Sequence, residues 1–297
     1  MSVDLNQLTF GLDPEFFAVY PENNTLKCIP PVAFKMDLGV RPVKIDPTPA
    51  PRNHDVYLDD KDFHWIHDGV AFELGVKRPL KNAKEMFDIV EHAKSNLINF
   101  LNQFGYMFYD RPSVEFDLKK YYDGRPEEFQ NCVIFGCDGD LDAIQSRYIC
   151  KIIDARKWPI RYGGGHFHLG SENKEHVEEI HKNIYSLIKL MACTLGIASI
   201  SMTPYIEEEK KRAKYYGKPG RFRYQPHGAE YRSPSNSWVR DRNSIETMIE
   251  CTKKAFYLFM NPKDGKDFLR RYLKDSVKAI RYSDKVLATE LLKETMK

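Results

Sequence analysis

Acidic and histidine side chains recur at every second position in two short segments. Asp13 and Glu15 lie in FGLDPEFF, and His166 and His168 lie in GGGHFHLG. On a β-strand, residues two apart point to the same face. Two carboxylates on one face repel each other and are costly to desolvate, and a divalent cation with a preference for oxygen ligands, such as Mg²⁺, removes that cost. The first segment therefore predicts a cation site. The alternative is a solvated turn, because Asp-Pro is common in turns.

The histidine pair is the more specific signal. His166 and His168 share one face of the expected strand, while Phe167 and Leu169 point the other way. The three preceding glycines allow the backbone to approach a ligand closely. A lone histidine is usually a hydrogen-bonded core residue, but paired imidazoles on one strand are typical metal or phosphate ligands. We therefore expect a functional role for this pair.

Further acidic residues complete a possible ligand set. Glu73 lies between apolar residues of an expected strand and could be a ligand, and the alternative is an exposed glutamate on an edge strand. Asp68 precedes a glycine and is expected in a turn. Carboxylates with one imidazole suit Mg²⁺ or Mn²⁺ better than zinc. The expected metal ligands, which should converge in one cleft, are Asp13, Glu15, Glu73, His166 and Glu230.

Basic residues follow in the run from Arg212 to Trp238. Arg221 and Arg223 share a strand face, as do Glu230 and Arg232. Arginine makes bidentate contacts with phosphate, and metal ions beside arginines indicate a nucleotide polyphosphate. The sequence contains no GxxxxGK[ST] loop and no protein-kinase signature. A nucleotide would therefore bind in another way.

The elements that must position these residues alternate between strands and helices. We expect strands at 8–20, 65–76, 106–118, 159–169 and 221–232, and helices at 82–104, 173–195 and 243–260, followed by charged helical segments. The segments 21–63 and 119–131 are expected to be loops, the first with turns and short hairpins. This pattern predicts an α+β fold with one mostly antiparallel sheet and helices over one face. No linker separates two units, so we expect a single domain over 1–297.

Composition excludes several classes of protein. The 297 residues include 45 Lys and Arg against 42 Asp and Glu, so a net charge of +3 argues against non-specific nucleic-acid binding. Hydrophobic residues at 42% are enough for a sizeable core, and we find no apolar run of about 18 residues. Six cysteines without CxxC spacing and an N-terminus without a secretory signal predict reduced thiols and a cytoplasmic protein.

Six motifs in order resemble a known family. They are FGLDPEFF, DGVAFE, FGCD, GGGHFHLG, YGKPG and EYRSPSNSW, which fall within residues 8–240 and leave a helical C-terminal part at 241–297. The sequence resembles the phage-type carboxylate–amine ligases, or amidoligases, of the glutamine synthetase and glutamate–cysteine ligase superfamily. Each motif is weak alone, but six in family order are specific.

This resemblance implies a fold, an activity and a set of ligands. The fold would be a glutamine synthetase-like curved antiparallel sheet with helices on its convex face, and ATP with two or three Mg²⁺ or Mn²⁺ ions on its concave face. ATP would phosphorylate a substrate carboxylate, and an amine would attack the acyl phosphate and release ADP and phosphate. The partners would be small-molecule or peptide carboxylates and amines, without a nucleic acid or a membrane. The protein would act in a host cytoplasm and could be oligomeric.

The resemblance also assigns roles to residues. It implies the same five metal ligands, although many superfamily members have Glu at the position of Asp13, and a Gly follows Cys137-Asp138 where the family has Pro. The residues implied to contact nucleotide phosphates are Arg212, Lys218, Arg221, Arg223 and Arg232. Arg232, Arg223 and His168 would act in catalysis, Tyr215–Gly220 could form a flap, and Asp68 or Glu115 could be the base.

Three other readings remain open. A metal-dependent double-stranded β-helix enzyme would also use an H-x-H pair and a later Glu, with His227 as a third histidine, but it leaves the arginines unexplained. A guanidino kinase-like phosphotransferase would stop after phosphoryl transfer. A catalytically silent phage protein would use the basic strip to hold nucleic acid or a partner.

Overall fold

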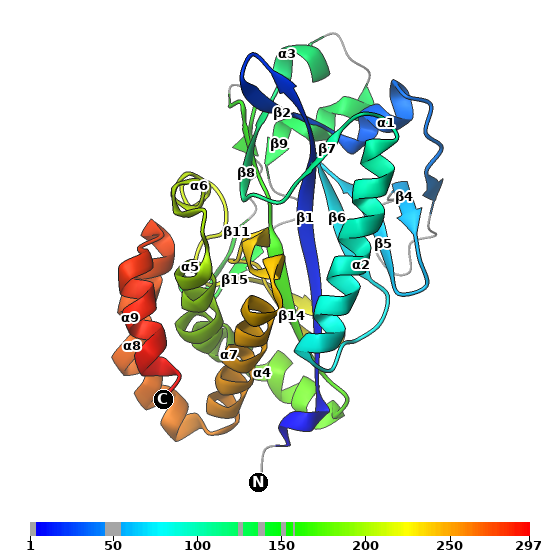
Figure 1. Ribbon diagram of the computed structural model, residues 1–297. Coiled ribbons are helices and arrows are strands. Elements are labelled where there is room, and N and C mark those ends of the chain that lie inside the picture. The colour runs from blue at the N-terminus through cyan, green and yellow to red at the C-terminus, as the bar shows by residue number, and fades with distance from the viewer. Residues whose placement is uncertain (1–3, 45–54, 124–126, 136–139, 150–152, 157) are drawn as a thin grey trace.

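A 15-residue strand, β1 (Leu8–Glu22), runs through the middle of the fold in the computed structural model (Figure 1). The structure describes the chain from residue 4 to 297, apart from 45–54, 124–126, 136–139, 150–152 and 157. Side chains alternate along the first half of β1: Leu8, Phe10 and Leu12 are buried in the main hydrophobic cluster, and Asp13 on the other face is half-buried. Because of this alternation, one face of β1 packs in the core and the other carries polar side chains.

The described strands form one 14-stranded sheet and one separate two-stranded ladder. The strand pairs of the described residues are antiparallel except for a parallel contact between β2 and β8, so the fold is α+β with a large, mostly antiparallel sheet, as predicted. Along the main path the order is β11 (Arg147–Ile149), β10 (Asp140–Asp142), β15 (Arg221–Gln225), β16 (Gly228–Tyr231), β14 (Gly165–Ser171), β1, β6 (Ala71–Val76), β5 (Phe63–Asp68), β4 (Asp55–Asp59) and β3 (Val43–Lys44). The remaining strands are β2 (Thr25–Ile29), β7 (Met107–Tyr109), β8 (Ser113–Phe116) and β13 (Ile160–Tyr162), with β9 (Ile134–Phe135) and β12 (Ile153–Asp154) in the separate ladder.

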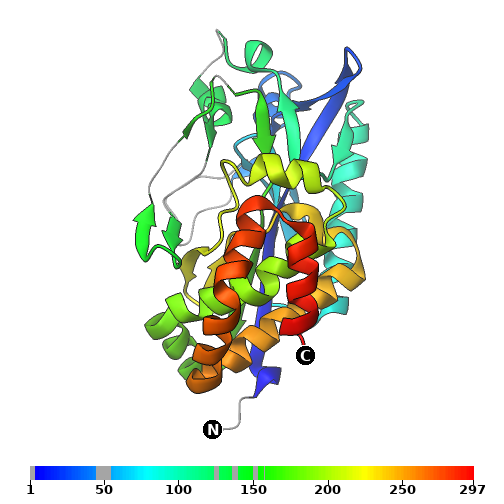
Figure 2. The same cartoon turned by 90° about the vertical axis from the view of Figure 1, so that its left-hand side faces the viewer.

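Helices pack against the sheet and against each other (Figures 1 and 2). The longer helices are α2 (Ala83–Asn102), α4 (Lys174–Met191), α7 (Arg242–Met260), α8 (Pro262–Tyr282) and α9 (Lys285–Thr295). The shorter ones are α1 (Pro31–Met36), α3 (Leu118–Tyr121), α5 (Ile197–Met202), α6 (Ile206–Arg212), the 3₁₀-helices η1 (Leu5–Gln7), η2 (Glu127–Val133) and η4 (Asn236–Arg240), and the π-helical turn η3 (Ala192–Gly196). Asn82 and Asn173 accept backbone N–H groups at the starts of α2 and α4 and are the N-caps of these helices.

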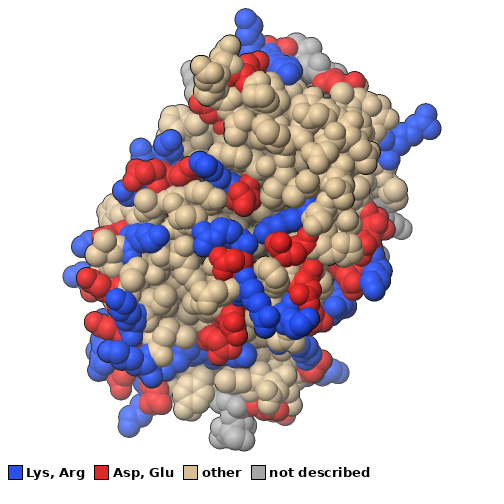
Figure 3. Space-filling view, in the orientation of Figure 1, with Lys and Arg blue, Asp and Glu red and all other residues tan. Residues whose placement is uncertain are grey.

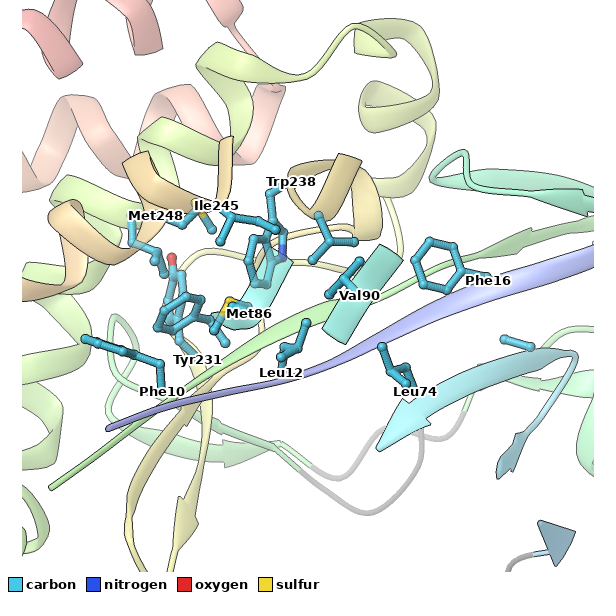
Figure 4. Packing of buried hydrophobic residues seen from close by; sticks show 14 of the residues in the cluster. Phe10, Leu12, Phe16, Leu74, Met86, Val90, Tyr231, Trp238, Ile245 and Met248 are labelled. Atoms are coloured by element: carbon cyan, nitrogen blue, oxygen red, sulfur yellow. The ribbon is translucent and has the colours of Figure 1, made fainter. Parts of the chain in front are cut away.

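The core lies between the sheet and these helices. Phe10, Leu12 and Phe16 of β1 point toward Met86 and Val90 of α2 and toward residues of η4 and α7 (Figure 4). Further along the sheet, Trp65 of β5 donates to the carbonyl of Ala93 in α2 over 3.1 Å, and the rings of Tyr185 in α4 and Phe222 in β15 are 5.3 Å apart. These contacts bury the apolar face of the sheet and leave the opposite face for polar residues.

Four expected strands are interrupted, and one of them, 106–118, divides into β7 and β8. The stretch 65–76 is a hairpin, because Asp68-Gly69 turns the chain between β5 and β6 with Gly69 at φ +56°. The stretch 159–169 divides into β13 and β14 on either side of Gly163 and Gly164. The stretch 221–232 is likewise a hairpin of β15 and β16.

Three helical expectations also differ from the structure. The segment 119–131, expected to be a loop, overlaps the short helix α3 and the 3₁₀-helix η2. The segment expected to be a helix at 173–195 continues through the π-helical turn η3 into α5 and ends at Met202. The segment 21–63, expected to hold turns and hairpins, also contains the short helix α1, which begins at Pro31, where proline is well suited to a first helical turn.

One helical stretch, Lys174–Met202, is long and apolar enough to cross a membrane by length and composition, but most of it is buried inside the fold, as in the core helix of a soluble protein.

The described cysteines, Cys28, Cys132, Cys193 and Cys251, are free and buried, and Cys137 and Cys150 lie outside the described residues. On the face shown in Figure 3, basic and acidic side chains are intermixed over the lower part of the molecule. That mixture agrees with the near-neutral composition.

Candidate metal and phosphate site

The polar face of β1 is the centre of the candidate site. Asp13 lies opposite His166 of β14 across the strand pair, and Glu15 lies opposite Glu73 of β6. Residues two apart on a strand are separated by about 6.6 Å along it, because each residue advances about 3.3 Å. β1 therefore contributes one carboxylate to each of two neighbouring clusters, and all five expected metal ligands fall in one or the other.

The first cluster comprises Asp13, His166 and Glu230, whose ligand atoms all lie within 4.8 Å of one another. His166 Nδ1 is 3.0 Å from Asp13 Oδ1 and 3.5 Å from Glu230 Oε1. Asp13 Oδ1 is buried and has no hydrogen-bond partner among the described residues. His168 approaches the same carboxylate from the side, with its Nε2 3.3 Å from Asp13 Oδ2.

The second cluster comprises Glu15, Asp68 and Glu73, again with ligand atoms within 4.8 Å. The hairpin of β5 and β6 creates it, because its turn places Asp68 beside Glu73 and both beside β1. The backbone N–H of Gly164 donates to Glu15 Oε2 over 2.8 Å. Asp68, expected in a turn and named as a possible base, is therefore a member of a possible cation site.

The two clusters ionise differently. Burial tends to raise the pKa of Asp13, but the charges of His166 and His168 outweigh it and hold the pKa well below its usual range. Burial likewise opposes ionisation of Glu230, yet the Arg232 guanidinium and the two histidines bring its pKa to about 2. For Glu15, burial and the charge of Asp68 raise the pKa to about 8 despite the Gly164 N–H. The carboxylates of the first cluster are thus ionised at neutral pH, whereas Glu15 in the second cluster tends to hold a proton.

The glycine triplet lets the backbone pass between the clusters. A Cβ on Gly164 would lie 2.8 Å from His166 Nε2 and 2.9 Å from Glu15 Oε1, so a side chain there would push both ligands aside. A Cβ on Gly165 would lie 2.2 Å from the carbonyl oxygen of Ser235. The glycine backbone therefore lies close to the two expected metal ligands Glu15 and His166 and to the segment 233–236.

Three of the expected phosphate-binding arginines lie beside the first cluster. Arg232 Nη1 contacts both Glu230 and His166 Nδ1, the latter at 3.2 Å. The neighbouring strand β10 supplies carboxylates to all three: Asp140 Oδ1 is 3.0 Å from Arg232 Nε and 3.5 Å from Arg223 Nε, and Asp142 Oδ2 is 3.7 Å from Arg221 Nε. The arginines thus form a basic group at one end of the site, partly neutralised by β10.

The other two basic residues expected to contact phosphate donate to main-chain carbonyls instead of lying beside the first cluster. Arg212 is buried and donates to the carbonyls of Gly163, Ser233 and Pro234 over 3.0, 2.9 and 2.8 Å. Lys218 donates to the carbonyls of Ala213 and Lys214 in its own loop. Both placements differ from the phosphate contacts expected from the sequence, because these donors are directed to main-chain oxygens.

The remaining candidates lie at the edge of the site or outside it. His227, the possible third histidine of a β-helix enzyme, stacks on His168 with ring centres 5.7 Å apart and belongs to neither cluster. Glu115, the other possible base, forms an ion pair with Lys27 where β8 meets β2. Cys137 and Asp138 of the FGCD motif lie outside the described residues.

Sequence reasoning missed Asp140 and Tyr216. Asp140 and Asp142 repeat the every-second-residue spacing of Arg221 and Arg223, so complementary charges on paired strands could have indicated the contact. Tyr216 lies in the recognised YGKPG motif, but its hydroxyl lies 3.0 Å from His166 Nε2, a contact that local spacing does not indicate.

Comparisons with known proteins add no assignment. No protein-family model matches the chain, and no curated protein matches its sequence. The function is therefore inferred from the geometry of the site and from the motifs themselves.

Proposed function

We propose that the protein is an ATP-dependent carboxylate–amine ligase, an amidoligase that forms an amide or peptide bond through an acyl phosphate. The observation that supports it most directly is the placement of two acidic clusters side by side on one sheet face, with an arginine group beside the first. Metal ions and arginines together serve phosphoryl transfer, in which negative charge must be stabilised on several oxygens.

The residues suit hard divalent cations. Five carboxylates and a single imidazole make up the two clusters, and oxygen-rich sites of this kind prefer Mg²⁺ or Mn²⁺ to zinc. The buried Asp13 Oδ1 without a hydrogen bond and the raised pKa of Glu15 are both relieved by a nearby positive charge. Bound cations would screen the repulsion between the nucleotide phosphates and an anionic carboxylate substrate.

The arginine group would hold the polyphosphate. Arg232 and Arg223 share Asp140, so a phosphate oxygen would compete with that carboxylate for the same guanidinium groups. The planar guanidinium groups favour bidentate contact with phosphate, and His168 contacts the second carboxylate oxygen of Asp13, with its Nε2 3.3 Å from Oδ2. Arg232, Arg223 and His168 are accordingly the residues to which we assign contact with the reacting groups.

The loop Tyr215–Gly220 would limit access of water. It follows α6 and places the hydroxyl of Tyr216 3.0 Å from His166 Nε2, next to the first cluster. An acyl phosphate hydrolyses readily, so a ligase must shield it until the amine attacks. Asp68 is the better placed of the two candidate bases, because Glu115 is paired with Lys27 away from both clusters.

The fold and the site bear on the alternatives. A single large sheet covered by helices is unlike the two facing sheets of a double-stranded β-helix, and His227 is outside both clusters. We propose instead that this is the curved sheet of the glutamine synthetase superfamily, with its concave face at the clusters, in a protein of a host cytoplasm. A guanidino kinase-like phosphotransferase would use the same site and differs only in its product.

Isotope transfer tests the reaction. The protein is incubated with ATP, Mg²⁺, a panel of carboxylates labelled with oxygen-18, and hydroxylamine as a general amine acceptor. We expect ADP, a hydroxamate and phosphate carrying one labelled oxygen, because one carboxylate oxygen leaves with the phosphoryl group. Glu230→Gln serves as the inactive control. A hydroxamate with unlabelled phosphate would refute the acyl phosphate, and a stable phosphorylated product would favour the kinase.

A further inference from the structure

The hydroxyl of Tyr216 contacts the histidine of the first cluster from behind. Its oxygen is 3.0 Å from His166 Nε2 and 3.4 Å from Arg232 Nη2. The other ring nitrogen, Nδ1, faces Asp13 and Glu230, so the two nitrogens of one imidazole meet a phenol on one side and two carboxylates on the other. Which nitrogen carries the proton decides whether the ring can bind a cation between those carboxylates.

Two contacts favour a proton on Nε2. Arg232 Nη1 can only donate hydrogen bonds, and it lies 3.2 Å from His166 Nδ1. This contact favours an acceptor lone pair, and not a hydrogen, on Nδ1. Arg232 Nη2 also approaches the hydroxyl of Tyr216, which makes that oxygen an acceptor that can take a second hydrogen from His166 Nε2. The neutral ring with hydrogen on Nε2 satisfies both contacts. It also places the Nδ1 lone pair 3.0 Å from Asp13 Oδ1 and 3.5 Å from Glu230 Oε1, a repulsion that a cation bound between them would remove.

We propose that Tyr216 is a positioning residue that fixes this tautomer of His166 and so directs the Nδ1 lone pair at the space between Asp13 and Glu230. The inference rests on the proposed cation site, and it assigns a function to a residue outside the ligand set. Metal-binding histidines commonly donate their second N–H to an outer partner, and loss of that partner lowers metal affinity by about 10- to 100-fold.

The packing around Tyr216 explains how its hydroxyl is held in place. The guanidinium of Arg212 lies over the tyrosine ring, 4.9 Å from its centre. Arg212 is itself fixed by three main-chain carbonyls and lies 3.8 Å from the buried carboxylate of Glu209. Gly217 allows this contact: it has φ +63°, and a Cβ there would lie 2.1 Å from Arg212 Nη1.

Arg212 thereby acts on the site through Tyr216. Its three acceptors belong to the glycine bend before β14 and to the segment after β16, which are the two segments on either side of His166. The same arginine therefore ties the Tyr216 loop to the strand that carries His166. This role accounts for a buried arginine that makes no contact with either cluster in the described structure.

The test compares Tyr216→Phe with Tyr224→Phe as a matched control. Tyr224 lies on β15 next to Arg223, but its ring contacts His181 and Phe222 on the helix side of the sheet. Long-range ¹H–¹⁵N spectra of metal-free protein report which nitrogen of each neutral imidazole is protonated, and His166→Asn identifies the signal of His166. Calorimetric titration with Mn²⁺ reports affinity.

We expect His166 to carry its hydrogen on Nε2 in the unsubstituted protein and in Tyr224→Phe. In Tyr216→Phe we expect a shift of hydrogen toward Nδ1 and an Mn²⁺ affinity about 10- to 100-fold lower. Far-ultraviolet circular dichroism confirms that each variant is folded, and Tyr216→Trp provides a second variant without the phenol. An unchanged spectrum and affinity in both variants would overturn the inference. If the unsubstituted protein binds no Mn²⁺, the proposed cation site fails, while the spectra still decide the role of Tyr216.

Discussion

At the scale of single residues, Asp13 and Glu15 show how neighbours on one strand face acquire opposite ionisation. Burial disfavours charge on both, but Asp13 faces two histidines, and its pKa lies well below the usual range. Glu15 faces Asp68 and Asp13, and its pKa is raised to about 8. The difference comes from which strand lies opposite each carboxylate, His166 on β14 or Glu73 on β6.

Glu15 makes the stability of the metal-free protein depend on pH. Between its unfolded pKa of 4.5 and its folded pKa of about 8, the folded state holds a proton that the unfolded state has released. The free energy of unfolding therefore falls as pH rises through that window, by at most about 1.4 kcal/mol per pH unit for this one group. Urea unfolding in the presence of a chelator measures this slope.

Glu15→Gln should flatten that slope, because the amide does not titrate. The exposed Glu246→Gln on α7 is the matched control and should leave it unchanged. The raised pKa of His168 gives a slope of the same sign, so the difference between the two variants isolates Glu15. Equal slopes in the two variants would contradict the assignment.

Arg223 and Arg232 are expected to contribute directly to ATP binding. Loss of a charge-assisted phosphate contact should weaken binding by about 1.5–3 kcal/mol in Arg223→Ala or Arg232→Ala. Equilibrium binding of a non-hydrolysable ATP analogue with Mg²⁺ measures the effect. Arg270→Ala, on the exposed face of α8, is the control. Affinities unchanged from the control in both variants would count against a phosphate site here.

At the scale of elements, the site is assembled by strands and loops that bring partners from distant parts of the chain. The β5–β6 hairpin supplies two of the three carboxylates of the second cluster. β10 supplies the acidic partners of the arginines on β15 and after β16. Helix α6 ends at Arg212, from which the following loop turns back over His166. The spacing of side chains along each element decides which of them share a face, but the neighbouring elements decide which partners those side chains meet.

Arg212→Lys tests the anchoring of that loop. A lysine keeps the charge but cannot reach three carbonyls with a planar fork, so buried acceptors lose their partners. We expect the free energy of unfolding to fall by about 1–3 kcal/mol, measured by urea denaturation. Arg270→Lys on α8 is exposed and should change little. A variant as stable as this control would show that the carbonyl contacts contribute nothing measurable.

At the scale of the whole molecule, helices cover one face of the sheet and the ligand clusters lie on the other. β1, β14 and β16 pack through Phe10, Phe167 and Tyr231 on the helix side and present Asp13, His166 and Glu230 on the other. The clusters exist only when these strands are paired. Cation binding should therefore be coupled to global folding, because the unfolded chain has no assembled site.

Mn²⁺ should accordingly stabilise the native state. At a free concentration about 100 times Kd, the gain in free energy of unfolding is about 2.7 kcal/mol, which thermal unfolding would register as a rise in Tm. Asp13→Asn should lose most of this gain, and Asp88→Asn on the exposed face of α2 should keep it. An Mn²⁺-dependent rise that persists undiminished in Asp13→Asn would place the cation elsewhere.

The sequence by itself determined the local features of this protein. The face shared by Asp13 and Glu15 follows from strand periodicity, the start of α4 from the capping side chain of Asn173, and the packing of strands from their alternating apolar residues. Four of the five proposed metal ligands, Asp13, Glu15, His166 and Glu230, were indicated in this way, because each shares a strand face with a second polar residue. Glu73 was indicated by its apolar strand context instead. These features depend on backbone geometry over a few residues.

Only the tertiary structure decided which of these local features meet. Asp68 joined Glu15 because a turn folded β5 onto β6, and Asp140 met Arg232 because β10 paired with β15. Arg212, which a basic segment suggested for phosphate, was buried under its own loop and held Tyr216. Such contacts join residues far apart in the chain, and their formation depends on how the apolar faces of whole elements are buried together.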